Sequence, residues 1–218
     1  MNEQARRLAQ YLLVDDPEIE HRIQSGIDTH RKGFGEISIL DVNGEPVSGA
    51  TVELRQTGHE FHFGCNAFML NQFPEAEQNA RYEEVFSELF NLAVVPFYWS
   101  DLEPEDGALR FKTNSRPIYR RPPPDDVLAF CERKGIIPKG HPLLWHHFRP
   151  SWLTHDEEAL KKRIQQRFQE IAECYADRIK IWDVCNEAQT WNSVKAINHM
   201  PENHVELAFD LAAQYFPD

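Results

Sequence analysis

Apolar positions recur along the chain with two different periods, which predicts helices and strands in succession. Near the N-terminus, Asp16 and Pro17 form a capping pair of the kind that begins a helix. Ile19, Ile23 and Ile27 then recur every four residues and would lie on one face. This stretch is expected to form a helix that packs against other parts of the protein.

The segment that follows changes to a period of two. Two turn dipeptides, Asn43-Gly44 and Ser48-Gly49, interrupt alternating apolar residues, namely Ile37, Ile39, Val47, Val52 and Leu54. An Asn-Gly turn between alternating residues is a strong signal for a β-hairpin. We therefore expect residues 1–58 to form an N-terminal accessory region, a helix plus a small β-hairpin, although a small sugar-binding sheet is also compatible with the pattern.

From residue 59 onward, strand-like and helix-like segments alternate. Strands are expected at Phe61–Asn66, Leu92–Trp99, Ile136–Trp145 and Ile179–Cys185. Helices are expected to begin at Pro74, near Asp125, at Thr154 and at Pro201. Four strand–helix units in a row predict an α/β fold with a parallel sheet and right-handed crossovers. Residues 59–218 are expected to be one domain.

Apolar faces and end signals support these helices. Thr154 and Glu157 have the spacing of a capping box, and Gly135 is placed to end the second helix. The first helix is expected to bury Tyr82, Val85, Phe86, Leu89 and Phe90, and the third Leu160, Ile164, Phe168, Ile171 and Tyr175.

Composition narrows the range of partners. The chain has 218 residues, 41% of them hydrophobic, which is enough for one sizeable core or two small ones. Its net charge of -12 argues against a nucleic-acid partner, because phosphate binding needs clustered Lys and Arg. The N-terminal apolar run Tyr11–Val14 is too short for a signal peptide or a membrane span, so the chain as written is expected to stay inside the cell.

The cysteines have no metal-type spacing. They stand in apolar surroundings at Cys65, Cys131, Cys174 and Cys185, so buried reduced thiols are expected rather than disulfides or a zinc site. No cofactor is expected.

The stretch Ile179–Ala188, I-K-I-W-D-V-C-N-E-A, carries the strongest chemical signal. Its apolar start is typical of a buried strand, and Asn186 and Glu187 follow where a parallel barrel places its active site. Taken alone, these two residues favour a different interpretation, a helix N-cap and a first-turn carboxylate.

The whole decapeptide resembles the acid/base segment of glycoside hydrolase family 10, the xylanase family, whose usual form is W-D-V-V-N-E-A. The resemblance implies that Glu187 protonates the glycosidic oxygen as general acid/base and that Asn186 holds a sugar hydroxyl. It also implies a (β/α)8 TIM barrel, a retaining cleavage of internal β-1,4 bonds in xylan or a related polysaccharide, and members that are often exported.

Two further segments are similar to the family. Lys139–His146, K-G-H-P-L-L-W-H, resembles R-G-H-T-L-V-W-H, which implies that His141 and Trp145 line the sugar pocket. Histidines at 141, 146 and 147 are also compatible with core or loop positions, and their spacing matches no common zinc site. The segment Trp99–Gly107 resembles W-x-x-x-E-P-x-x-G and makes Trp99 a candidate sugar contact.

Two departures qualify the resemblance. Where xylanases carry E-N-x-M-K before the tryptophan, whose side chains grip the neighbouring xylose, this chain has Val95-Pro96-Phe97-Tyr98, and Phe148 replaces a glutamine. The resemblance therefore specifies the family more firmly than the substrate, and another β-linked glycan is compatible with it.

The family's nucleophile, a second glutamate after barrel strand seven, has no counterpart in the sequence. The resemblance covers about the first four of eight strand–helix units, since such a barrel needs about 250 residues. The expectation is a C-terminally truncated fragment, inactive alone, whose open sheet edges favour self-association. Two alternatives stay open: a non-catalytic glycan-binding module with an aromatic pocket of Trp99, Trp145 and Trp191, and an assembly protein that pairs two half barrels.

Overall fold

The computed structural model describes residue 7 and residues 15–188 and 200–217. Trp191 lies outside the described residues. The chain divides into two units, Met1–Gly58 and His59–Asp218, and each unit is described by itself.

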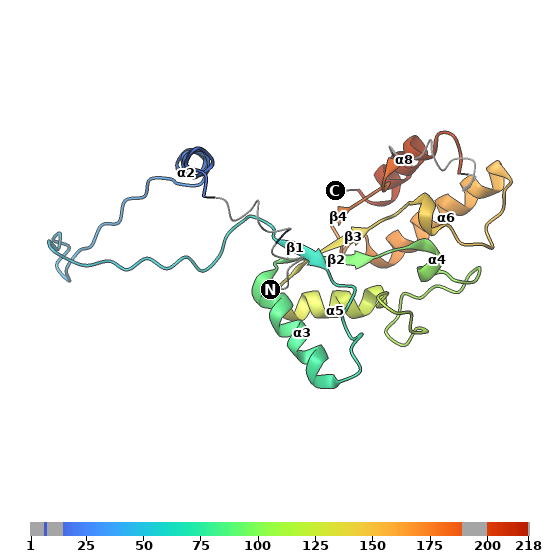
Figure 1. The fold of residues 1–218 in the computed structure, drawn as a ribbon, viewed down its shortest axis with the longest axis horizontal. Helices are drawn as coiled ribbons and strands as arrows, with labels where there is room; N and C mark the ends of the chain where they lie inside the picture. The colour runs from blue at the N-terminus through green and yellow to red at the C-terminus, as the bar shows by residue number, and fades with distance from the viewer. Residues whose placement is uncertain (1–6, 8–14, 189–199, 218) are drawn as a thin grey trace. The chain divides into compact units, whose positions relative to one another are not determined.

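The first unit contains one well-formed helix and one turn. Helix α2 (Pro17–His30) begins as predicted, because the Asp16 carboxylate accepts hydrogen bonds from the backbone of Glu18 and Ile19 (Figure 1). None of its residues is buried, and Ile19 and Ile23 are each about half exposed, so the predicted packing face is not formed in the structure.

The predicted hairpin of the first unit is reduced to its turn. Gly44 has a φ of +84°, and the Asp41 carboxylate accepts from the backbone N–H groups of Asn43 and Glu45. An isolated antiparallel bridge joins Leu40 to Pro46, and the described residues of this unit form no strand. The prediction of two hairpin strands is therefore wrong for this structure; an isolated two-stranded hairpin has little stability of its own.

The second unit is built on a four-stranded sheet in which every pair is parallel. Its strands are β1 (Gly64–Asn66), β2 (Leu92–Pro96), β3 (Ile137–His141) and β4 (Ile181–Trp182), in the order β1-β2-β3-β4 (Figure 1). The register pairs Pro96 with His141 and Gly140 with Trp182. The prediction of an α/β fold with sequential parallel strands is confirmed.

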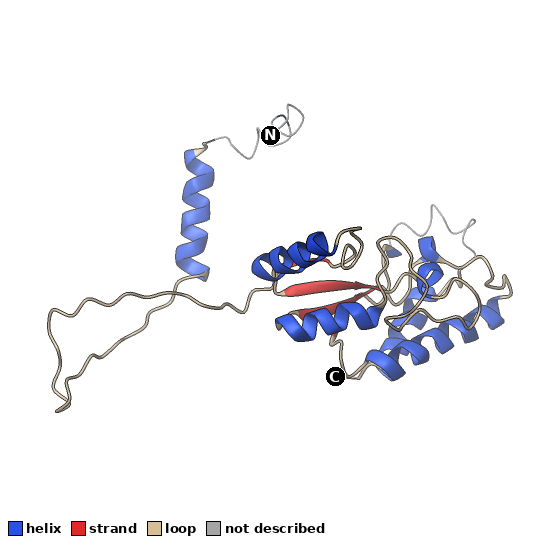
Figure 2. Cartoon of the chain, turned by 90° about the horizontal axis from the view of Figure 1, so that it is seen from below, coloured by secondary structure: helices blue, strands red, loops and turns tan. Residues whose placement is uncertain are grey.

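Helices follow the strands and run alongside them (Figure 2). Their bounds are α3 (Ala76–Leu89), α4 (Trp99–Leu102), α5 (Pro124–Lys134), the 3-10 turn η1 (His146–Phe148), α6 (Glu157–Tyr175) and α8 (His204–Tyr215). Gly135 ends α5 with a φ of +66°, as predicted. The capping box at Thr154 is wrong by two residues, since the Asp156 carboxylate caps α6 by accepting from the Ala159 N–H at 2.8 Å.

The core lies between this sheet and α5 and α6. The predicted face of α6 is confirmed, since Leu160, Ile164, Phe168, Ile171 and Tyr175 are all buried. The prediction for α3 is confirmed for Phe86, which is buried, and in part for Tyr82 and Phe90, which are partly buried and pack against the core, but it is wrong for Leu89, which is 61% exposed. Two thiols also depart from expectation: Cys65 and Cys174 are exposed, and all four cysteines are free.

Each strand is shorter than its apolar pattern suggested. The strands β2, β3 and β4 end early because the chain bends away at the carboxyl end of the sheet, whereas β1 ends as predicted and begins three residues late. After β2 the chain enters α4 at Trp99, and after β3 and β4 it runs into loops joined by one isolated bridge between Leu144 and Cys185. These bends position the candidate site. Within the described residues, no helix combines the length and apolarity needed to cross a bilayer.

Candidate active site

The candidate site lies at the carboxyl edge of the parallel sheet. The loops after β3 and β4 are joined there by backbone hydrogen bonds. The Leu144 N–H donates to the Val184 carbonyl at 3.0 Å, and the Asn186 N–H donates to the Leu144 carbonyl at 2.9 Å. This pairing brings Trp145 beside Glu187. Residues 42 positions apart in the sequence are thus joined by backbone hydrogen bonds that the sheet register dictates.

Glu187 is held at this edge by a neighbouring indole. Trp145 Nε1 donates to Glu187 Oε2 at 3.1 Å, and His147 Nε2 lies 3.8 Å from the same oxygen. The Glu187 side chain is 47% exposed, so the carboxyl remains accessible to a ligand. Asn186 precedes it in a half-buried position.

The backbone of Glu187 has a left-handed conformation, with a φ of +52°. For a residue other than glycine this costs of order 1–2 kcal/mol, and such strain is concentrated at functional sites. A left-handed residue does not belong to the first turn of a right-handed helix, so the interpretation of Glu187 as a first-turn carboxylate does not describe this structure.

His141 is oriented by a carboxylate that the sequence analysis did not single out. Asp183 accepts from His141 Nδ1 at 2.8 Å and from Lys139 Nζ at 2.9 Å. Burial raises the pKa of Asp183, but the hydrogen bonds from Lys139 and His141 outweigh it and hold the pKa below its usual value. An ionised Asp183 fixes the proton on His141 Nδ1 and so sets the tautomer of the ring. Sequence reasoning could have found Asp183, because it stands in the W-D-V segment that this chain shares with the family motif.

An aromatic cluster lines the rim next to this pair. Tyr98 is its centre, with ring centroids 5.6 Å from His141, 5.5 Å from Trp145 and 4.4 Å from Phe148, onto which it stacks. Phe68, which follows β1, packs edge-on at 5.7 Å. The rim therefore draws on the ends of β1, β2 and β3.

Trp99 does not belong to this rim. It is 3% exposed, and its Nε1 donates to the fully buried Glu103 carboxylate at 2.9 Å. Glu103 also accepts from the Gly107 N–H at 2.8 Å and contacts Arg163. The E-P-x-x-G segment is thus a structural turn around a buried ion pair, and Trp99 has no free ring face for a sugar. We do not include it in the proposed site.

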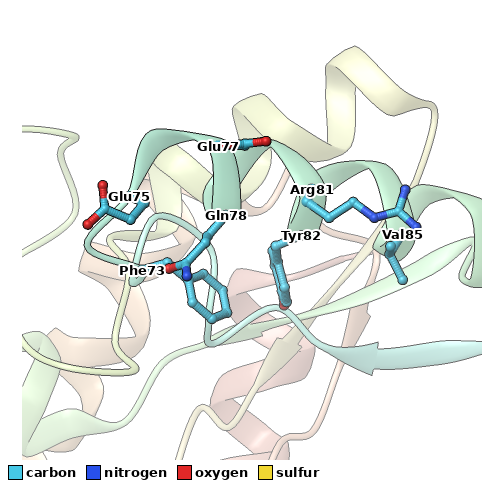
Figure 3. Close-up of a pocket in the computed structure, with 7 residues that line it drawn as sticks. All are labelled: Phe73, Glu75, Glu77, Gln78, Arg81, Tyr82 and Val85. Carbon is cyan, nitrogen blue, oxygen red and sulfur yellow. The ribbon is translucent and has the colours of Figure 1, made fainter.

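A separate pocket of about 630 Å³ lies along α3 (Figure 3). The rings of Phe73 and Tyr82 meet in it at 5.8 Å, and its polar lining comes from the same helix and the residue before it. It contains none of the predicted site residues. Among the residues that the structure describes, no group of three or more His, Cys, Asp or Glu side chains is arranged to hold a metal ion.

Comparison with known proteins gives a consistent family. Residues 71–218 match the family model described as Glycosyl hydrolase family 10. Endo-1,4-beta-xylanase A of Thermotoga maritima is 28% identical over 127 residues, which cover 52% of this chain and 11% of that protein. Beta-1,4-xylanase of Dictyoglomus thermophilum is 28% identical over 131 residues, which cover 56% of this chain and 37% of that protein.

Solved structures show the same fold. Xylanase 10B from Thermotoga petrophila RKU-1, solved in complex with xylobiose, aligns with a TM-score of 0.53 at 22% identity over 72% of this chain and 46% of that one. Native xylanase 10B from Thermotoga maritima aligns with a TM-score of 0.53 at 23% identity over 72% of this chain and 47% of that one. The present chain thus spans less than half the length of these proteins, and its sheet corresponds to part of a (β/α) barrel. Because the family model matches well over half of its residues, this chain belongs to glycosyl hydrolase family 10.

Proposed function

We propose that this protein is a glycosidase acting on β-1,4-linked xylan or a related glycan, with Glu187 as the general acid/base. The observation that carries the proposal is the hydrogen bond from Trp145 Nε1 to Glu187 Oε2, which holds an accessible carboxyl at the edge of the Trp145 ring. Sugar rings stack on the faces of such rings through their apolar C–H groups, while their hydroxyls need polar partners. Sugar bound on Trp145 would therefore lie next to the acid.

The other pocket residues have supporting roles in this proposal. His141, with its tautomer fixed by Asp183, offers Nε2 to a sugar hydroxyl. Asn186 precedes Glu187 and is proposed to hold a hydroxyl beside the scissile bond. Xylanases of known structure, one of them solved in complex with xylobiose, support a polysaccharide or oligosaccharide as the substrate class.

A retaining mechanism needs a nucleophilic carboxylate about 5–5.5 Å from the acid/base. Asp183 is engaged by Lys139 and His141, and we assign no nucleophile among the described residues. We therefore propose that the 218 residues bind sugar and supply the proton, and that they hydrolyse glycans only together with a carboxylate from elsewhere.

The test is hydrolysis of xylan and xylo-oligosaccharides by the full-length gene product, with and without Glu187→Gln. General acid–base catalysis contributes about 10²–10⁴-fold to rate, so a loss of this size is expected with little change in oligosaccharide affinity. Glu105→Gln, an exposed loop carboxylate, is the matched control and should leave the rate unchanged. Equal rates for wild type and Glu187→Gln would remove Glu187 from the mechanism.

A glycan-binding protein without hydrolysis is the second candidate, favoured by the aromatic rim and by the unassigned nucleophile. Oligosaccharide affinity with no turnover by the full-length product would establish it. Self-association is a further proposal, since β1 and β4 each pair with a single strand among the described residues. Light scattering that gives a dimer mass would support it.

A further inference from the structure

Tyr98 lies between the sheet and the candidate sugar pocket. It lies two residues after the end of β2 and immediately before α4, so its ring stands at the carboxyl edge of the sheet. It touches both His141 and Trp145, the two residues proposed to line the pocket. No other described side chain has ring contacts with both of these residues and with Phe148.

The Tyr98 ring is fixed, whereas its hydroxyl is available. Phe148 stacks on the ring, and the Arg121 guanidinium carbon lies 4.2 Å from the ring centroid. The hydroxyl forms no hydrogen bond with any described residue, and its oxygen is not fully buried. Buried tyrosine hydroxyls usually find a partner, so this one is suited to receive it from a ligand.

The charges around Tyr98 favour a neutral ligand. Burial raises the pKa of Tyr98 above its usual value; Arg121 opposes this rise, and the charges of Asp101 and Glu187 add to it. The phenol therefore keeps its proton at neutral pH and stands within electrostatic range of Glu187. Arg121 is itself paired with Asp101 at 2.7 Å, so its charge is already balanced.

We propose that Tyr98 is a specificity-determining residue whose hydroxyl donates a hydrogen bond to a hydroxyl of an uncharged sugar bound on Trp145, next to the bond that Glu187 protonates. This inference rests on the proposed function. It gives the position before Trp99 a polar contact of its own, in a segment where the sequence had suggested that sugar contacts were missing. The stacked Phe148 holds the phenol in place for that contact.

The physical argument separates a contact from simple packing. If Tyr98 only packs, removing its hydroxyl leaves the ring contacts intact and does not change the affinity for sugar. If it binds sugar, loss of one neutral hydrogen bond weakens binding about three- to tenfold. Tyr98→Phe is therefore the informative variant, because it keeps the stacking on Phe148 and the contact with Arg121.

The experiment measures binding of xylobiose and of its singly deoxygenated analogues to the full chain by calorimetry. Wild type, Tyr98→Phe and Trp145→Ala are compared, and Tyr119→Phe, at a tyrosine that is 70% exposed, is the matched control. We expect Tyr98→Phe to bind xylobiose about three- to tenfold more weakly. Wild type should bind one deoxy analogue more weakly than it binds xylobiose. Tyr98→Phe should bind that analogue and xylobiose with the same affinity, because the contact to the missing hydroxyl is already lost.

The outcomes separate this inference from the proposed function. Unchanged affinity in Tyr98→Phe, together with weakened binding in Trp145→Ala, overturns the role of Tyr98 and leaves the sugar site in place. Weaker binding by Tyr98→Phe that is uniform across all deoxy analogues also overturns it, because a direct contact must be coupled to one hydroxyl. No binding of any probe by wild type overturns the sugar site and this inference with it.

Discussion

Arg167 is the buried cation that holds the rim of the sheet together. It extends from α6, is 2% exposed, and donates through Nε to the Leu143 carbonyl at 2.8 Å. Its Nη2 donates to the Phe97 carbonyl and, at 3.4 Å, to that of Pro142. One guanidinium thus bridges the chain just beyond β2 and β3. Burial lowers its pKa to about 9, so it remains charged at neutral pH.

Arg167→Met keeps an unbranched apolar stem but removes these donors. Two good hydrogen bonds from a charged group are lost, each worth about 1.5–3 kcal/mol, and the carbonyls of Phe97 and Leu143 are left buried without this donor. The expected loss in the free energy of unfolding is about 3–6 kcal/mol. Because Met carries no charge, the variant also avoids the cost of burying the guanidinium, so the loss should lie nearer to about 3 kcal/mol.

Urea unfolding followed by tryptophan fluorescence measures this loss, because every tryptophan in the sequence lies after residue 98 and so reports on the second unit. Arg178→Met is the matched control, since Arg178 is 37% exposed and pairs at the surface with Glu132; it should lose less than about 1 kcal/mol. A loss for Arg167→Met no larger than that of the control would refute the reasoning.

Two further predictions concern β3 and β4. Gly140→Ala should reduce the free energy of unfolding by about 1–3 kcal/mol, because a Cβ there would lie 2.1 Å from the Trp182 ring. Thermal unfolding measures this loss, with Gly26→Ala as the control, because nothing lies within 4 Å of a Cβ at Gly26. Since the pKa of Asp183 is lowered in the folded state, its ionised form stabilises the fold above the unfolded pKa of about 4, and this contribution is lost as pH falls through the folded value. The stability gap between wild type and Asp183→Asn should therefore be constant near neutral pH and shrink below about pH 4, and an unchanged gap at pH 3 would contradict the assignment.

The sequence predicted the parts of the fold that depend on periodicity. The α6 face was predictable because Leu160, Ile164 and Phe168 repeat at helical spacing and all meet the core. The hairpin was not, because alternating residues such as Ile37 and Ile39 form strands only when another element covers them, and both are exposed here.

The candidate site was predictable in part for a similar reason. Glu187, His141 and Trp145 stand in motifs, and the structure brings them to one edge of the sheet. Whether an aromatic side chain faces the pocket or the core depends on the bend after a strand, which no local pattern encodes. Tyr98 and Trp99 are adjacent, yet the bend into α4 turns the first toward the rim and the second onto a buried carboxylate.

Two arginines of α6 hold the chain in that bend. Arg163 and Arg167 lie one turn apart on the same side of the helix. Arg163 contacts Glu103, which in turn accepts from Trp99, while Arg167 binds the backbone on the other side of Tyr98, at Phe97. Both flanks of Tyr98 are therefore fixed from beneath by buried charges that no sugar would touch. The position of the rim is set by the Arg163–Glu103 ion pair and by the hydrogen bonds of Arg167 to the backbone, and side chains at the rim can change ligand preference without disturbing the fold that presents them.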